Sequence, residues 1–152
     1  ESLSLTNLTE CGTAYSVDTV RHFAALAKDH GLNVHLDGAR LANALLSTGA
    51  RPAEMTWKAG IDVLTLGLTK TGAIGCEIIL LFGQLREQMG ALKASAKRSG
   101  HMPPKMRFLE AQGTPISTGP RRLLSMARRG VSICLSLGHA RSRLRRFASA
   151  IG

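Results

Sequence analysis

The stretch "VHLDGARLAN", residues 34–43, decides how the rest of the sequence is interpreted. An apolar segment leads into Asp37, Gly38 and Arg40, and a run with helical spacing follows at once. An acidic residue at the carboxyl end of a strand stands where an open α/β sheet binds its ligands. Asp37 is therefore a candidate ligand-binding residue.

Strand and helix signals alternate on both sides of this stretch. Residues 1–13 are expected to be strand-like with a loop, and further strands are expected over 32–37, 61–68 and 75–83. Helices are expected over 16–31, 39–47 and 84–99, in a short turn opened by Pro52, and again from 103. Ser16 and Gly31 are the expected capping residues of the first helix, and Gly49 is expected to stop the second. The strand at 61–68 is apolar enough to be buried on both faces, and the short gap to 75–83 predicts an antiparallel pair. The pattern describes an α/β domain of which only half is present.

Length and composition are those of one ordinary globular domain. The chain has 152 residues, 44% of them hydrophobic, and its apolar runs are far shorter than the roughly 20 residues of a membrane helix. We expect a cytoplasmic protein. The three cysteines, Cys11, Cys76 and Cys134, form no CxxC or CxxH pair, so buried thiols are expected and neither a disulfide framework nor a zinc site.

The net charge of +10 is unevenly distributed along the chain. Residues 111–152 contain eight arginines and no acidic residue, whereas residues 1–110 contain 12 Lys and Arg against 10 Asp and Glu. From Gly113 onward the chain also lacks Lys, Asn, Gln, Tyr and Trp. A basic arm could bind nucleic acid, but this amino-acid composition is unusual for a protein surface under natural selection.

A second marked stretch is "TLGLTKTGAIG", residues 65–75, where Lys70 stands just past the end of a strand. Desolvation there would disfavour the ammonium form, so that the amine could attack a carbonyl, although most isolated lysines simply reach solvent from a loop. Lys70 follows Asp37 by about one strand-helix-strand unit, so both should face one crevice. Pyridoxal phosphate requires this pairing: the lysine holds its aldehyde as a Schiff base, and the carboxylate keeps its ring nitrogen protonated.

Two further residues carry less weight. His35 and Asp37 share a strand face, but the sequence offers no third metal ligand, so we expect a hydrogen-bonded strand histidine and no metal. Trp57 is expected in the core rather than as a stacking platform.

Several segments together resemble the low-specificity L-threonine aldolases, which belong to the β-eliminating lyase group. The similarity covers residues of about 2–112 and rests on "TECGTAYSVD", "GLNVHLDGARLANALL", "PAEMTWKAGIDVLTLGLTKTGAIGCEIILLF" and "KRSGHMPPKMRFLEAQ". It implies the pyridoxal-phosphate-dependent aminotransferase-like fold, with residues 1–112 as the C-terminal portion of the large, cofactor-binding domain and a mostly parallel sheet flanked by helices.

The resemblance also implies the roles of individual residues. Lys70 would be the catalytic Schiff-base lysine and Asp37 the partner of the pyridine nitrogen. Arg40 would contact the cofactor's 3'-oxygen or the substrate carboxylate, and Lys97 would reach the phosphate of a neighbouring subunit's cofactor.

The implied activity is cleavage of threonine, allo-threonine and related β-hydroxy-α-amino acids to glycine and an aldehyde, in the service of glycine biosynthesis. The implied assembly is a homotetramer, a dimer of dimers with active sites at subunit interfaces, and no membrane or nucleic-acid partner is expected. The catalytic base, the phosphate loop and a second carboxylate-binding arginine of the family correspond to none of these residues. We therefore expect a fragment that does not bind pyridoxal phosphate tightly by itself.

Alternatives remain open at this point. A different pyridoxal-phosphate lyase would share Lys70 and Asp37, and a non-catalytic fragment or remnant would owe any polyanion affinity to its basic tail. The sudden change of composition at 113–152 is also what a GC-rich gene gives in the wrong reading frame. We therefore hypothesise a frameshift near codon 112, which translation of the other two frames would test.

Overall fold

The computed structural model describes residues 1–71, 77–101 and 108 of the chain. The elements are β1 (Ser2–Thr6), α1 (Val17–Asp29), β2 (Asn33–Asp37), α2 (Leu41–Thr48), α3 (Pro52–Met55), η1 (Trp57–Ala59), β3 (Val63–Gly67), η2 (Thr69–Thr71), β4 (Glu77–Leu81), η3 (Gly83–Gln88) and α4 (Met89–Arg98). The helix expected from 103 and the tail 113–152 lie outside the described residues, apart from Phe108.

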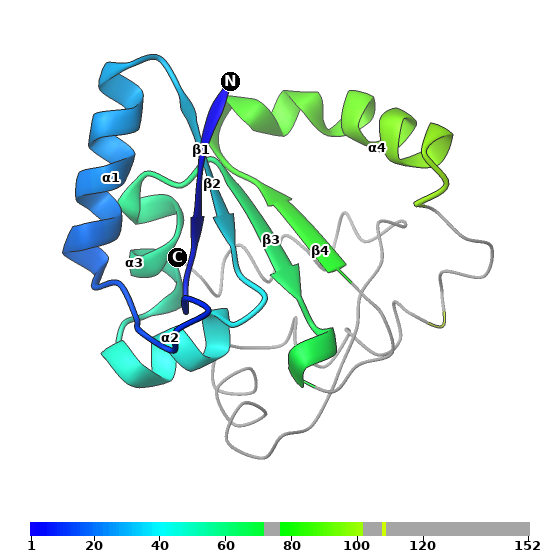
Figure 1. Cartoon of the computed structure of the whole chain (residues 1–152). Coiled ribbons are helices and arrows are strands. Elements are labelled where there is room, and N and C mark those ends of the chain that lie inside the picture. The colour runs from blue at the N-terminus through cyan, green and yellow to red at the C-terminus, as the bar shows by residue number, and fades with distance from the viewer. Residues whose placement is uncertain (72–76, 102–107, 109–152) are drawn as a thin grey trace.

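The four strands form one sheet in the order β1-β2-β3-β4. The pairs β1–β2 and β2–β3 are parallel, whereas β3 and β4 are antiparallel. Figure 1 shows the first three strands running in one direction and the fourth returning beside them. The predicted α/β class and the predicted antiparallel turn-back are thus confirmed. The carboxyl ends of β2 and β3 meet at one edge of the sheet, which is where the candidate residues lie.

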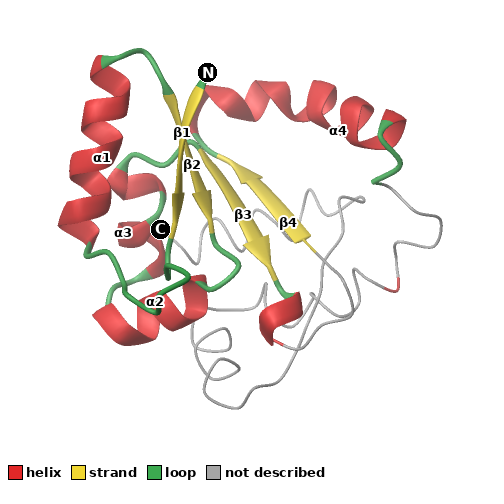
Figure 2. Cartoon of the chain, in the orientation of Figure 1, coloured by secondary structure: helices red, strands yellow, loops and turns green. Residues whose placement is uncertain are grey.

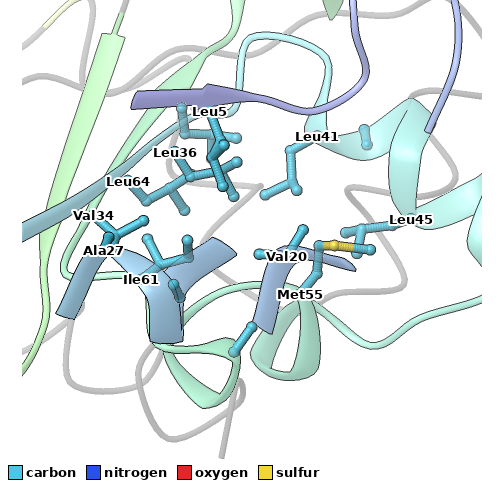
Figure 3. Packing of buried hydrophobic residues seen from close by; sticks show 14 of the residues in the cluster. Leu5, Val20, Ala27, Val34, Leu36, Leu41, Leu45, Met55, Ile61 and Leu64 are labelled. Carbon is cyan, nitrogen blue, oxygen red and sulfur yellow. The ribbon is translucent and has the colours of Figure 1, made fainter. Parts of the chain in front are cut away.

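One face of the sheet carries the hydrophobic core (Figure 3). Strand residues such as Leu36 and Leu64 pack there against Val20 of α1, Leu45 of α2 and Met55 of α3, all nearly without solvent exposure. Figure 2 shows these helices gathered on the same side of the strands. At about 25 cal/mol per Å² of apolar surface removed from water, this layer is the main source of stability. It holds the strand ends in a fixed register.

Helix ends follow the capping residues expected from the sequence. The Ser16 hydroxyl accepts a hydrogen bond from the Thr19 amide at 3.1 Å, and α1 begins at the next residue, Val17. Gly49 ends α2 in the left-handed conformation with φ of 69°, a conformation that glycine adopts without steric cost. The segment 84–99 differs from the prediction of one helix: its first part is the 3-10 helix η3, and the α-helix begins at Met89.

Three expectations about burial are wrong. Trp57 is 42% exposed and stacks under the Lys58 ammonium at 5.2 Å from the ring centroid, so the tryptophan is not part of the core. Cys11 is an exposed free thiol, while Cys76 and Cys134 lie outside the described residues. The strand β3 is not fully buried on both faces, since Val63 and Thr65, which face away from the core, are only half-buried.

Among the described residues, no helix is long and apolar enough to cross a membrane.

Candidate active site at the carboxyl edge of the sheet

Asp37 ends one strand and Lys70 follows the end of the neighbouring parallel strand, as the sequence predicted. Asp37 is the last residue of β2 and pairs in register with Thr65 of β3. Lys70 lies in η2, the single turn that follows β3. Both residues therefore stand at the same edge of the sheet, Asp37 half-buried and Lys70 exposed.

The exposure of Lys70 corrects one part of the sequence argument. Burial was expected to disfavour the ammonium form, yet the side chain of Lys70 is open to solvent in this chain. The case for Lys70 therefore rests on its position and on its charged neighbours.

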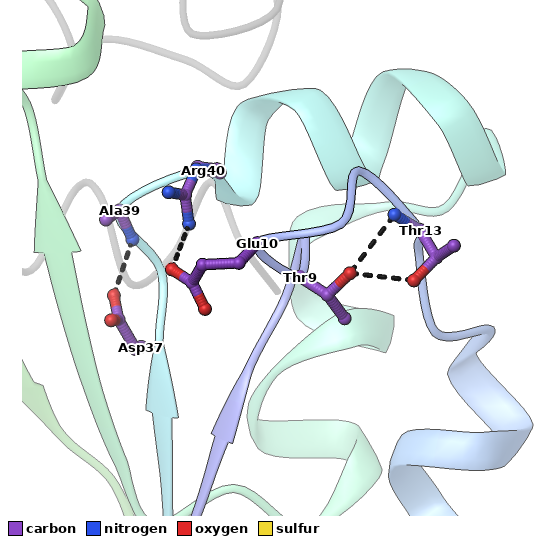
Figure 4. A network of polar contacts seen from close by, with 6 residues as sticks. All are labelled: Thr9, Glu10, Thr13, Asp37, Ala39 and Arg40. Atoms are coloured by element: carbon purple, nitrogen blue, oxygen red, sulfur yellow. Dashed lines mark hydrogen bonds and ion pairs between the residues drawn. The ribbon is translucent and has the colours of Figure 1, made fainter.

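The turn that follows Asp37 is tightly constrained. The Ala39 amide donates to Asp37 Oδ1 at 2.9 Å, and the Gly38 amide donates to the Thr65 carbonyl at 2.7 Å (Figure 4 shows the first of these). A Cβ atom on Gly38 would lie 2.8 Å from Leu64 Cδ1 and 2.9 Å from the Thr65 carbonyl oxygen. Only glycine therefore fits between Asp37 and the next strand, which explains the residue after the aspartate in "DGAR".

A third charged residue, Glu77, belongs to this edge. Glu77 begins β4 and pairs with Gly67, the last residue of β3. A Cβ atom on Gly67 would meet the Glu77 carboxylate oxygens at 3.0 and 3.2 Å and Ala39 Cα at 3.3 Å. The carboxylate of Glu77 thus lies over the end of β3, beside the turn that follows Asp37.

The electrostatics of Glu77 tie the three charged residues together. Partial burial, followed by repulsion from Asp37, raises the pKa of the Glu77 carboxyl above its ordinary value, and the positive charge of Lys70 opposes this rise. Asp37 and Lys70 are therefore both close enough to act on the same carboxylate. The sequence analysis missed Glu77, because only the β3–β4 register brings it to this edge.

Arg40 points toward a different partner. Its Nη1 donates to Glu10 Oε1 at 2.9 Å, and the arginine side chain is 25% exposed (Figure 4). Glu10 stands in the loop after β1, within the "TECGT" stretch. The structure brings Arg40 to the same edge as Asp37, and an acidic residue from that loop holds its guanidinium.

Asn7 holds the base of the loop that carries Glu10. The Asn7 side chain is fully buried; its Nδ2 donates to the Tyr15 carbonyl at 3.2 Å, and its Oδ1 accepts from the Tyr15 amide at 3.1 Å. Within the loop, Thr9 and Thr13 hydroxyls lie 2.7 Å apart. The Asn7 side chain therefore bonds to both backbone groups of Tyr15 and joins the two ends of the loop.

His35 is the hydrogen-bonded strand histidine that was expected. Its Nδ1 lies 2.8 Å from Ser4 Oγ and its Nε2 lies 3.0 Å from Thr65 Oγ1, so one imidazole links three strands. Among the residues described, no group of three His, Cys, Asp or Glu side chains could hold a metal ion.

Lys97 does not join this cluster. It lies in the last turn of α4 and is exposed. Figure 1 shows α4 starting at the opposite edge, where the parallel strands begin. Its expected role toward a neighbouring subunit stays a prediction.

Comparison with known proteins gives a family match, two curated relatives and one solved structure. The family model described as beta-eliminating lyase matches residues 2–136. The low specificity L-threonine aldolases of Pseudomonas sp. (strain NCIMB 10558) and Pseudomonas aeruginosa are 44% and 43% identical over 109 residues, which is 72% of this chain. A solved structure of Leishmania major threonine aldolase is 30% identical, covers 60% of this chain and 28% of its own, and has a TM-score of 0.45.

The extent of these matches differs between the relatives and the family model. This chain spans 31% of the length of either curated relative. The family match also continues past residue 112 to residue 136, so it enters the arginine-rich segment where a change of reading frame was hypothesised. The division of the chain at residue 112 stays a prediction.

The family model covers most of the chain, including β2 with Asp37, the turn η2 with Lys70 and β4 with Glu77. The chain belongs to the beta-eliminating lyase family.

Proposed function

We propose that this chain carries the lysine and carboxylate end of an L-threonine aldolase that uses pyridoxal phosphate. The observation that supports this most directly is the meeting of Asp37 and Lys70 at one sheet edge, where both act on Glu77. The names of the two Pseudomonas relatives favour aldol cleavage over the other reactions of β-eliminating lyases. The substrates would be threonine, allo-threonine and related β-hydroxy-α-amino acids, and the products glycine and an aldehyde.

The residues present fit this cofactor. Lys70 offers an exposed primary amine for an aldehyde, and Asp37 offers a half-buried carboxylate for a ring N–H. The backbone at Gly38 and Gly67 leaves no room for a side chain between these groups and the strands below. When bound, pyridoxal phosphate would supply an electron sink for cleavage of the Cα–Cβ bond.

Each residue of the chain then has a distinct task. Asp37 would hold a proton on the ring nitrogen, because a charge-assisted hydrogen bond in a partly dry site is strong. Lys70 would hold the cofactor in the absence of substrate. Arg40 would bind the cofactor's 3'-oxygen or the substrate carboxylate with its planar guanidinium. It would do so either while keeping its hydrogen bond to Glu10 or after giving that bond up. Lys97 is proposed to serve the phosphate in a neighbouring subunit of a homo-oligomer.

The test for Lys70 is a graft into a relative. The 109 matched residues of the Pseudomonas sp. aldolase are replaced by those of this chain, and acetaldehyde release from threonine is measured. We expect Lys70→Ala to abolish release, and borohydride reduction to leave the pyridoxyl group on Lys70 in peptide maps. Lys58→Ala is the matched control, because Lys58 lies against Trp57 and not at the sheet edge. Full activity of the Lys70→Ala graft would exclude the assignment.

The test for Asp37 separates holding the cofactor from using it. In the same graft, Asp37→Asn should reduce acetaldehyde release by roughly 100-fold or more, because the ring nitrogen loses its anionic partner. Reduction should still label Lys70. Near-normal turnover of this variant would remove Asp37 from the mechanism.

A further inference from the structure

The function proposed above gives Arg40 an oxygen anion to bind but leaves its partner Glu10 without a task. Arg40 Nη1 donates to Glu10 Oε1 at 2.9 Å, and Figure 4 shows the two side chains reaching toward each other. The glutamate side chain is 76% exposed and the arginine side chain 25%. An ion pair with so exposed a partner adds little to stability, because water screens it. The contact therefore matters mainly for where it holds the guanidinium.

Glu10 is presented by a hydrogen-bonded turn. The Gly12 amide donates to the Thr9 carbonyl at 3.0 Å, which closes a four-residue turn with Glu10 at its second position. The Thr9 amide donates to the Thr13 carbonyl at 3.0 Å, and the Thr13 amide donates to the Thr9 hydroxyl at 3.1 Å. Gly12 has a φ of 80°, which glycine adopts without steric cost. The backbone that carries Glu10 is therefore held independently of the contact with Arg40.

The loop that carries Glu10 is also tied to the strand end that precedes Arg40. The Asn7 amide donates to the Asp37 carbonyl at 3.3 Å. The buried Asn7 side chain bonds to both backbone groups of Tyr15, at the far end of the loop. The loop and the end of β2 are thus joined through the backbone, and the Glu10–Arg40 pair is a second link between them.

The contact with Glu10 engages one nitrogen of Arg40. A guanidinium carries five N–H donors in one plane, so an arginine that gives one of them to a carboxylate can give others to a second anion. Because Glu10 holds Nη1 from the side of the loop, rotation of the guanidinium is restricted. Its other donors therefore keep one orientation.

We propose that Glu10 is a positioning residue that orients the Arg40 guanidinium for the oxygen anion that Arg40 binds. The proposal rests on the function proposed for Arg40, and the anion is the cofactor's 3'-oxygen or the substrate carboxylate. Glu10 touches neither of them and keeps its hydrogen bond to Arg40 while the ligand binds. A side chain that is already held in its bound orientation loses less conformational entropy, so Glu10 raises the affinity for this anion.

The negative charge of Glu10 would have the opposite effect, because it repels an incoming anion. Most of the Glu10 side chain is exposed, so solvent and salt screen this repulsion, and orientation should be the larger effect. Glu10→Gln separates the two effects, since glutamine keeps an acceptor oxygen and removes the charge. Glu10→Ala removes both.

The first test measures the order of the Arg40 guanidinium in the full chain without any ligand. ¹⁵N relaxation of the Arg40 Nε–H group gives its order parameter. We expect Glu10→Ala to lower this order parameter by roughly 0.2 or more, and Glu10→Gln to retain most of it. An Arg40 order parameter that does not respond to Glu10→Ala would overturn the proposal.

The matched control for this measurement is a second exposed ion pair in the same chain. Asp18 bonds to Arg21 within α1, away from the sheet edge. Asp18→Ala should lower the order parameter of Arg21 and leave that of Arg40 unchanged.

The second test measures affinity in the graft into the Pseudomonas sp. aldolase, built to include Glu10 and Arg40. Glu10→Ala should raise one of two constants by roughly 3- to 10-fold, which is the effect of about one hydrogen bond. A raised KM for threonine would identify the substrate carboxylate as the anion. A raised dissociation constant for pyridoxal phosphate, measured by absorbance titration of the apoenzyme, would identify the 3'-oxygen. Glu10→Gln should restore most of the affinity.

A double-mutant cycle shows whether Glu10 acts through Arg40. In the Arg40→Ala background, Glu10→Ala should cause no further change in either constant, because the group that Glu10 orients is gone. An effect of Glu10→Ala that persists undiminished in that background would refute the positioning role.

The failures of the two proposals can be told apart. If Arg40→Ala leaves both constants unchanged, the function proposed for Arg40 falls, and the role of Glu10 falls with it. If Arg40→Ala raises one constant and Glu10→Ala raises neither, the role of Arg40 stands and that of Glu10 falls.

Discussion

The two faces of the sheet are built from the same strands and have opposite chemistry. Leu36 and Leu64 point into the layer covered by α1, α2 and α3, and are at most 3% exposed. Their immediate neighbours His35 and Thr65 point the other way and hydrogen bond to each other at 3.0 Å. Because side chains alternate along a strand, a single five-residue strand serves both faces. One face supplies stability, and the other ends in the charged corner of Asp37 and Glu77.

This contrast predicts that the energetic consequences of substitution differ sharply between the faces. The largest loss is expected for Leu36→Ala, because Leu36 is fully buried and its removal leaves a cavity. The free energy of unfolding should fall by about 2–5 kcal/mol in a denaturant titration. Leu26→Ala is the matched control: Leu26 is 48% exposed and should change stability by less than about 1 kcal/mol. Equal losses in the two variants would contradict the assignment of the core.

The polar face should respond more weakly. His35→Leu removes two side-chain hydrogen bonds, to Ser4 and to Thr65, and should lower the free energy of unfolding by about 1–2 kcal/mol. Ser4→Ala removes one of them at an exposed position and should have the smaller effect. A His35→Leu variant as unstable as Leu36→Ala would show that the polar face also carries the core of the fold.

Gly67→Ala sharpens the comparison, because it should alter the charged corner and leave the apolar layer intact. The new methyl group would meet the Glu77 carboxylate and the backbone at Ala39. We expect a changed Glu77 titration in ¹³C NMR with a loss of stability of about 1 kcal/mol. Gly90→Ala, where a Cβ atom meets no atom within 4 Å, is the control and should leave Glu77 as it was.

The smallest expected effect is a dependence of stability on pH. Glu77 has an ordinary pKa of about 4.5 in the unfolded chain, and folding raises this pKa. At a pH between the unfolded and the folded pKa, the folded chain therefore binds more protons than the unfolded chain. Stability from this residue is therefore fully present below the unfolded value and is lost as pH rises through the folded value. Glu77→Gln should remove this decrease when unfolding is measured at several pH values. A slope that is unchanged in Glu77→Gln would assign it to another group.

Much of the fold could be read from local signals. The Ser16 cap, the Gly49 stop and the spacing of apolar residues place α1 and α2, because capping and amphipathic burial depend on residues within one or two turns. The short gap before β4 dictates its antiparallel direction. Exposure was harder to predict: Trp57, Cys11 and Lys70 were all expected to be less exposed than they are, because exposure depends on which elements pack over a residue.

For the candidate site, too, some features follow from the sequence and others only from the tertiary structure. The sequence by itself determined that Asp37 and Lys70 end neighbouring parallel strands, because the strand-helix-strand spacing between them allows little else. The tertiary structure alone decided that Glu77 joins them and that Arg40 turns to Glu10. Both of these contacts depend on the register between strands and on the path of a loop after β1. A shift of one residue in the β3–β4 register would place Glu77 on the opposite face of the sheet, and no local pattern in the sequence encodes that choice.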